Sequence, residues 1–182
     1  MAKKIILPVN YPEFEGNVIF LAGPVIGAPR WQNKAIGVIN DLDSKVNIAC
    51  PSYELDREYF RDSWIFVEDM PRRTFDREWP EVDWQMHYIE EAFNKGCLLF
   101  WLAEEEKHCC EYPYAQGSRA ELFGKLTRKG NLVLGIERGF PGDEYIVYYF
   151  RKNRPETPIF SSLGKTCEKA IEIARKNRNE YF

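Results

Sequence analysis

Short apolar runs alternate with amphipathic stretches along this chain. Five runs bounded by glycine, proline or polar residues predict buried strands at 17–22, 46–50, 97–102, 131–136 and 157–160. Apolar residues at helical spacing predict helices at about 29–43, 80–95, 118–129, 145–150 and 161–178. Strands that alternate with helices form parallel sheets covered on both faces. The pattern predicts an α/β fold, a flavodoxin- or Rossmann-like three-layer sandwich with a five-stranded parallel sheet, in one domain over residues 1–182.

Residues 51–79 interrupt this alternation. The segment mixes aromatic residues with Asp, Glu and Arg, and contains no clear continuation of the strand and helix pattern. A connection this long inside a compact domain is usually a lid or a binding loop. We therefore expect a lid-like insertion. The alternatives, which remain open, are a surface excursion whose aromatics pack on the core and a dimer contact.

Composition narrows the class of ligand. Hydrophobic residues make up 45% of the chain, as in an ordinary globular domain. Lys+Arg 25 against Asp+Glu 28 gives a net charge of −3, which does not favour binding to a nucleic-acid polymer. The aromatic content of 15% favours stacking on a planar ligand. These values predict a small-molecule ligand.

No segment predicts a membrane span or a disulfide framework. No apolar run approaches the roughly 20 residues of a membrane helix, and the apolar N-terminal part is too short for a signal peptide. We therefore expect a cytoplasmic protein without membrane association. The five cysteines are odd in number and irregularly spaced, and Cys50 and Cys97 lie in predicted core strands.

His108-Cys109-Cys110 is the segment most similar to a metal site. Adjacent cysteines do not easily face one tetrahedral zinc ion, no second cysteine pair completes a site, and the chain has only two histidines. Walker, GxGxxG and Ser-His-Asp patterns are also missing. The sequence therefore predicts neither a metal nor a cofactor.

Carboxylates are the remaining candidates for chemistry. Glu104 follows the central strand, Asp83 lies early in the helix before it, and Glu121 opens the helix after it. Open α/β sheets bind ligands beyond the carboxyl ends of their strands, and two carboxylates flanking one bond are suited to glycosidic cleavage. A simpler interpretation is that Ser118 and Glu121 form a capping box and that the acidic residues 104–106 are solvated.

Three segments in order resemble the nucleoside 2-deoxyribosyltransferase family, in its deoxyribosyltransferase-like branch. They are Phe-Leu-Ala-Gly-Pro at 20–24, Val-Asp-Trp-Gln at 82–85, and Phe-Trp-Leu-Ala-Glu at 100–104 followed by Ser-Arg-Ala-Glu-Leu-Phe-Gly at 118–124. The resemblance covers roughly 17–137. The chain departs from the family pattern at Gln85, where the branch tends to have Glu, and in the interrupted Glu-Leu-Phe-Gly.

The resemblance implies roles for three carboxylates. Glu121 takes the place of the nucleophile that attacks C1′ of the sugar, in the ionised form that a helix N-terminus favours. Glu104, with Glu105 or Glu106 as substitutes, would orient the sugar or assist proton transfer. Asp83 would contact the leaving nucleobase.

It also implies a substrate pocket. The loop Gly23–Gly27, with Gly23 and Pro24, would line it together with Ser118. Trp31 or Trp84 would stack on the base. The family's oligomers further imply a homodimer or higher homo-oligomer, with pockets that borrow residues from a neighbouring subunit.

The expected function is cleavage or transfer of the N-glycosidic bond of (deoxy)nucleosides through a covalent glycosyl-Glu121 intermediate. Whether the chain is a transferase or a hydrolase stays open. One alternative is a nucleoside 5′-monophosphate N-glycosidase, with Arg30, Arg72 or Arg73 clamping the phosphate. Another is a non-catalytic nucleotide-binding or sensor module, which Gln85 favours.

Overall fold

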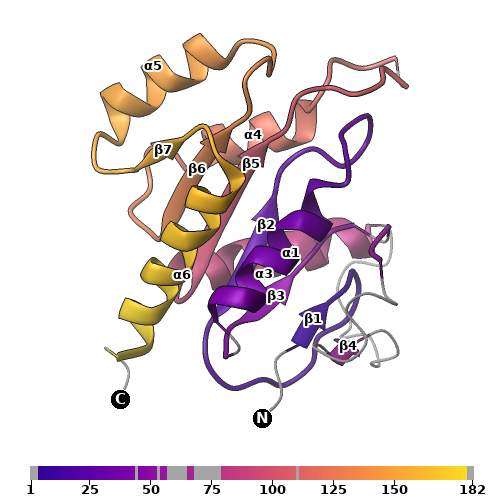
Figure 1. Cartoon of the computed structure of the whole chain (residues 1–182), viewed down its shortest axis with the longest axis vertical. Coiled ribbons are helices and arrows are strands. Elements are labelled where there is room, and N and C mark those ends of the chain that lie inside the picture. Colours follow the sequence, from indigo (N-terminus) through magenta and orange to yellow (C-terminus); the bar gives the residue numbers. More distant parts are fainter. Residues whose placement is uncertain are drawn as a thin grey trace.

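The computed structural model describes residues 4–43, 45–52, 54–56, 65–67, 79–109 and 111–179, with the backbone alone at 65–67 and at 178–179. Within these residues a seven-stranded sheet runs in the order β4-β1-β3-β2-β5-β6-β7 (Figure 1). Every neighbouring pair is parallel. The predicted α/β class with a parallel sheet is therefore confirmed.

The elements follow one another in a strand-then-helix order. The strands are β1 Lys4–Ile6, β2 Val18–Ala22, β3 Asn47–Ala49, β4 Ile65–Val67, β5 Cys97–Leu102, β6 Leu132–Ile136 and β7 Ile159–Phe160. The helices are α1 Trp31–Leu42, α3 Pro80–Asn94, α4 Gln116–Gly124, α5 Asp143–Asn153 and α6 Leu163–Asn179. Parallel neighbouring strands need crossover connections, which helices on the sheet faces usually provide.

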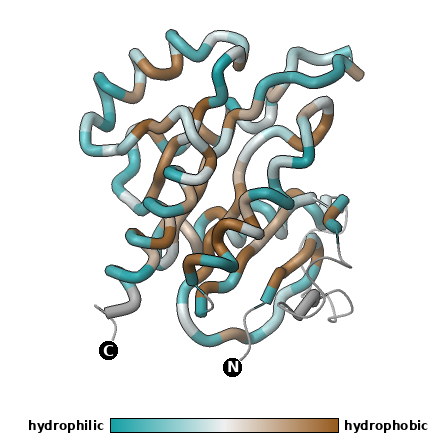
Figure 2. Tube along the Cα trace, viewed as in Figure 1, coloured by the Kyte–Doolittle hydropathy of each residue, from teal (hydrophilic) through white to brown (hydrophobic). Residues whose placement is uncertain are grey.

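Helices cover both faces of the sheet, which gives three layers (Figure 1). Helices α1 and α6 pack on one face, and α3, α4 and α5 pack on the other. Side chains alternate along β5, so that Leu99 and Trp101 enter the first core while Leu98 and Phe100 enter the second. Strands buried on both faces read as continuous apolar runs, as Figure 2 shows for the centre of the sheet.

The sheet has two strands more than predicted. All five predicted strands are present, but β1 and β4 extend the sheet at one edge, where β1 pairs with both β3 and β4. Each has three residues, β1 near the N-terminus and β4 inside the irregular segment 51–79, and neither was predicted. Since β4 lies inside 51–79, that segment is not a loop throughout. Most of the predicted lid lies outside the described residues.

The order of the strands reverses between β2 and β5. From β2 the chain continues to β3 on one side, whereas β5, β6 and β7 follow one another on the other side. Loops after the two strands at such a switch point separate and leave a crevice beyond their carboxyl ends. The fold therefore places a binding crevice after Ala22 and Leu102.

No helix in the described part of the chain is both long enough and apolar enough to cross a lipid bilayer.

Candidate functional site

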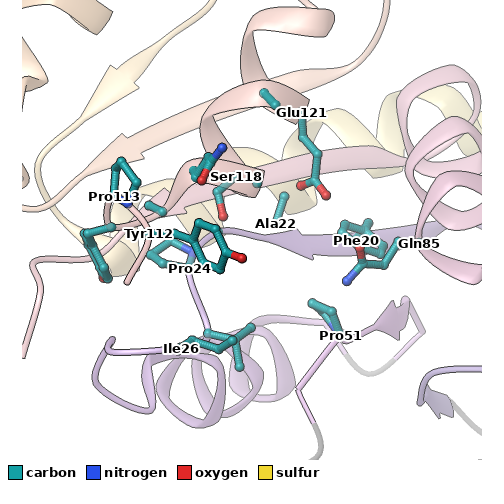
Figure 3. Close-up of a pocket in the computed structure, with 17 residues that line it drawn as sticks. Phe20, Ala22, Pro24, Ile26, Pro51, Gln85, Tyr112, Pro113, Ser118 and Glu121 are labelled. Carbon is teal, nitrogen blue, oxygen red and sulfur yellow. The ribbon is translucent and has the colours of Figure 1, made fainter. Parts of the chain in front are cut away.

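A cavity of about 540 Å³ lies at this switch point. Its walls come from the ends of β2 and β3, the loops after β2 and β5, helix α3 and the first two turns of α4. Most of the lining is apolar, and its polar side chains include Gln85, Ser118 and Glu121 (Figure 3). A mostly apolar pocket with a few convergent polar groups is the usual form of a small-molecule site.

Gly23 and Pro24 form the wall that follows β2. The φ of Gly23 is +151°, and a Cβ at this position would lie 2.2 Å from the carbonyl oxygen of Trp101. The indole Nε1 of Trp31 donates a hydrogen bond of 2.8 Å to the carbonyl oxygen of Pro24. The missing side chain of Gly23 lets this wall lie close to the end of β5, and the hydrogen bond from Trp31 holds Pro24 in place.

The loop after β2 is joined to the loop after β5. The amides of Glu106 and Lys107 donate to the carbonyl oxygen of Gly27 at 2.8 and 3.1 Å. The buried Tyr114 hydroxyl donates to the carbonyl oxygen of Ala103 at 2.9 Å. These bonds fix the second loop along the cavity although it has no regular secondary structure.

Helix α4 brings Ser118 and Glu121 to the cavity. The helix starts at Gln116, after Ala115 in the left-handed conformation, and no side chain caps it. Ser118 is therefore inside the helix and the predicted capping box is wrong. Because Ser118 and Glu121 are three residues apart, they share one face of α4, and both point into the cavity (Figure 3).

Burial dominates the ionisation of Glu121. It raises the pKa of this carboxyl to about 7, and the nearby Lys125 ammonium only partly opposes the shift. Glu121 lies in the second turn of α4, beyond the first turn where the helix dipole acts most strongly. Burial therefore shifts Glu121 toward the neutral acid, which is opposite to the direction expected from the helix terminus.

Glu104 and Asp83 do not line the cavity. The Glu104 carboxylate lies close to Gly139, where a Cβ would be 2.5 Å from its Oε1, and its backbone amide donates to Glu137. Asp83 is on α3, and its buried Oδ2 has no hydrogen-bond partner among the described residues. The structure thus brings only Glu121 of the three predicted carboxylates to the cavity.

The two substitutes for Glu104 lie on the same loop. Glu105 contacts His108 through a 2.6 Å Oε1–Nδ1 approach, and the Glu106 side chain is exposed. Neither residue lines the cavity. The described residues contain no group of three potential metal ligands.

Both tryptophans predicted to stack on a base are core residues. Trp84 is 0% exposed, and its Nε1 donates to the carbonyl oxygen of Asn10 at 2.8 Å. Trp31 is 2% exposed and supports the Pro24 wall from behind. Buried indoles commonly use their N–H group in this way, so both rings hold the site from the core and neither lines it.

Several lining residues carried no individual prediction, although Ile26 lies in the loop Gly23–Gly27 that was expected to line the pocket. Gln85 extends from α3 toward the cavity, and Ile26, Pro51 and Tyr112 line its mouth (Figure 3). Ile26 and Tyr112 are each 69% exposed. The glycines at 23 and 27 were the sequence signal for Ile26, which lies between them. Tyr112 had none, since its distance from β2 depends on the packing of two loops.

The cavity lining contains no Lys, Arg or His within the described part of the chain. Arg30, one of the predicted phosphate ligands, forms an exposed ion pair of 3.3 Å with Glu54. Arg72 and Arg73 lie outside the described residues.

Comparison of the chain with protein-family models finds no match, and comparison with curated proteins finds none. The resemblance to the nucleoside 2-deoxyribosyltransferases therefore stays a prediction. The fold and the cavity define a parallel α/β protein with a carboxylate-containing site at its switch point.

Proposed function

We propose that this protein cleaves or transfers the N-glycosidic bond of (deoxy)nucleosides, with Glu121 as the nucleophile. The observation that carries the proposal is the single carboxylate that α4 directs into an otherwise mostly apolar cavity at the switch point. A planar base fits between apolar walls, and Phe20, Pro24 and Tyr112 are among them. The sequence resemblance, which assigns the nucleophile to Glu121, gives independent support.

The reaction is a double displacement. A Glu121 carboxylate oxygen bonds to C1′ while the C1′–N bond breaks, and the base leaves with that electron pair and takes a proton from water. A second base or water then donates an electron pair to C1′, the C1′–O ester bond breaks, and Glu121 is restored. The acceptor of the second step releases a proton when it bonds to C1′, so the protons balance over the cycle. The acceptor decides whether the product is a new nucleoside or a free sugar.

Burial of Glu121 suits this role. A carboxylate with a pKa of about 7 is more basic than one in water, and a large fraction is still ionised at neutral pH. Gln85 of α3 also extends toward the cavity and offers an amide donor and acceptor to the substrate. Asp83, two residues earlier on α3, does not line the cavity and is given no role in the proposed reaction.

The lining favours a nucleoside over a nucleotide. A 5′-phosphate is usually held by Arg or Lys, and the described lining offers neither. The alternative, a 5′-monophosphate N-glycosidase, is favoured only by the amides of the α4 N-terminus at the cavity wall.

The test is incubation of the protein with a deoxynucleoside plus a different free base, followed by chromatography. A new nucleoside indicates a transferase, and free base without exchange indicates a hydrolase. Parallel reactions with the 5′-monophosphate compare the two substrate classes. No product from any nucleoside or nucleotide would overturn the enzymatic proposal and favour a binding module.

The nucleophile is tested separately. Glu121→Gln should lower kcat by about 10³-fold or more, because the amide does not form the ester. Glu168→Gln on α6 removes the same charge at an exposed position away from the cavity and should leave kcat unchanged. A 2-deoxy-2-fluoro-arabinosyl nucleoside should label the peptide that contains Glu121, as seen by mass spectrometry. Full activity of Glu121→Gln would exclude it as nucleophile.

A further inference from the structure

Helix α5 presents an exposed aromatic surface. Tyr145 and Tyr148 are 59% and 61% exposed, and Tyr149 beside them is 36% exposed. Large exposed aromatic side chains gathered on one face mark interaction sites more often than scattered apolar residues do. The opposite side of α5 packs on the core through Ile146 and Phe150, so the helix is anchored while this face stays open.

The aromatic rings hold one another in place. The Tyr145 and Tyr149 ring centroids are 4.7 Å apart, and those of Tyr148 and Tyr149 are 6.2 Å apart. Phe123 of α4 contacts Tyr149 edge-on at 5.8 Å. Pre-ordered tyrosines lose little side-chain entropy on association, which suits them to a protein interface.

Charged residues flank the central tyrosine symmetrically. Glu144 comes four residues before Tyr148 and Lys152 four residues after it, so the three form one stripe along α5. Glu144 and Lys152 are exposed, and neither has an ion-pair partner among the described residues. This stripe, Glu144-Tyr148-Lys152, is called the α5 stripe below.

The α5 stripe is complementary to a second copy of itself. A two-fold axis through Tyr148 makes two α5 helices antiparallel and stacks Tyr148 on its counterpart. The same axis places Glu144 of each copy opposite Lys152 of the other, twice per dimer. In a two-fold contact the same surface must match itself, and this spacing of acid, aromatic and base meets that condition.

We propose that two copies of this chain pair through antiparallel α5 helices, with Tyr148 at the two-fold axis and two Glu144–Lys152 ion pairs beside it. Helix α5 lies at the periphery of the molecule, where a second copy has access to it (Figure 1). The proposal does not depend on the proposed function. It assigns a surface to the homo-oligomer that the sequence resemblance implies only in general terms.

Sedimentation velocity over a concentration series tests the pairing. The wild-type chain should show a monomer–dimer equilibrium. Glu144→Lys and Lys152→Glu should each weaken it at least about tenfold, because each replaces two attractive pairs with two repulsive ones. Tyr148→Ala should weaken it by a similar factor, since central tyrosines dominate such interfaces. Circular dichroism checks that these exposed substitutions leave the fold intact.

The two single charge variants also test the antiparallel arrangement. Mixed in equal amounts, Glu144→Lys pairs its two lysines with the two glutamates of Lys152→Glu, so the mixture should dimerise although each variant alone is monomeric. The double variant Glu144→Lys/Lys152→Glu should dimerise as well. A wild-type monomer at all concentrations, a dimer insensitive to the single changes, or a mixture that stays monomeric would each overturn the proposal.

Discussion

Glu121 is the residue at which local and tertiary effects conflict. Its place near the start of a helix favours a charged carboxylate, whereas its burial beside the cavity favours the neutral acid. Burial is the stronger effect and raises the pKa to about 7. The conflict has consequences for both activity and stability.

The pH dependence of activity should show the ionisation of Glu121. A nucleophile reacts as the carboxylate, so kcat/KM should rise about tenfold per pH unit below about 7 and level off above that value. The ratio kcat/KM is measured from pH 5 to 9, since it reflects the free protein. A rate that instead falls through about pH 7 would assign Glu121 the role of a proton donor.

The stability of the fold should depend on the same group. An ordinary glutamate in the unfolded chain ionises near 4.5, whereas Glu121 in the folded chain ionises near 7. Between these values the folded state binds more protons, so Glu121 lowers the free energy of unfolding progressively as pH rises. Glu121→Gln should therefore stabilise the protein by about 1–3 kcal/mol above pH 7 and by nearly nothing below pH 4.5.

Urea denaturation at pH 4 and pH 8 measures this difference. Glu168→Gln is the control, because its exposed side chain stays in water in both states. An equal effect of Glu121→Gln at the two pH values would contradict the assigned burial of this carboxyl.

At the scale of elements, the site depends on the loops that follow β2 and β5, which hydrogen bonds hold side by side. The loop after β2 receives the Trp31 hydrogen bond at Pro24 and the amide bonds of the β5 loop at Gly27. Ala115, which has a φ of 57°, ends the β5 loop in a left-handed turn and starts α4 at the cavity wall. A non-glycine residue in this region is strained, as often seen at binding sites.

Gly23→Ala should disrupt this arrangement. The added Cβ would approach the Trp101 carbonyl oxygen to 2.2 Å, and the φ of +151° is unfavourable for alanine. We expect a loss of on the order of 3 kcal/mol in the free energy of unfolding. Gly37→Ala in α1 is the matched control, with no atom within 4 Å of its added Cβ.

The control Gly37→Ala should raise the free energy of unfolding by roughly 0.5–1 kcal/mol, because alanine is more favourable than glycine inside a helix. Urea denaturation of both variants gives the comparison. A Gly23→Ala protein as stable as the wild type would show that the wall after β2 is not tightly held.

At the scale of the whole molecule, the order of elements could be read from the sequence. The central strands are continuous apolar runs, as for Cys97–Leu102, because both faces of the sheet are buried there. Helices such as Pro80–Asn94 were also predictable, since their apolar residues recur at helical spacing. The strands β1 and β4 were not predicted: β1 is a short strand near the N-terminus, and β4 lies inside the irregular segment 51–79.

The candidate site was only partly predictable. Glu121, Ser118, Gly23 and Pro24 lie at element ends that the fold brings to one edge of the sheet, and the cavity includes all four. The direction of a side chain could not be predicted in the same way. The Glu104 carboxylate, for example, lies beside Gly139 and not in the cavity. Spacing along the chain says where a residue lies on its element but not which neighbour it packs against.

The sequence by itself therefore determined the helices and five of the seven described strands, because these follow from local hydrophobic periodicity. It also determined the edge of the sheet where a site would form, because parallel strands end at the same edge. Only the tertiary structure decided that Trp31 and Trp84 are buried supports, that Gln85 and Tyr112 reach the cavity, and that Glu121 has a raised pKa. Burial and desolvation arise from packing between segments distant in the chain, and no local pattern contains that information.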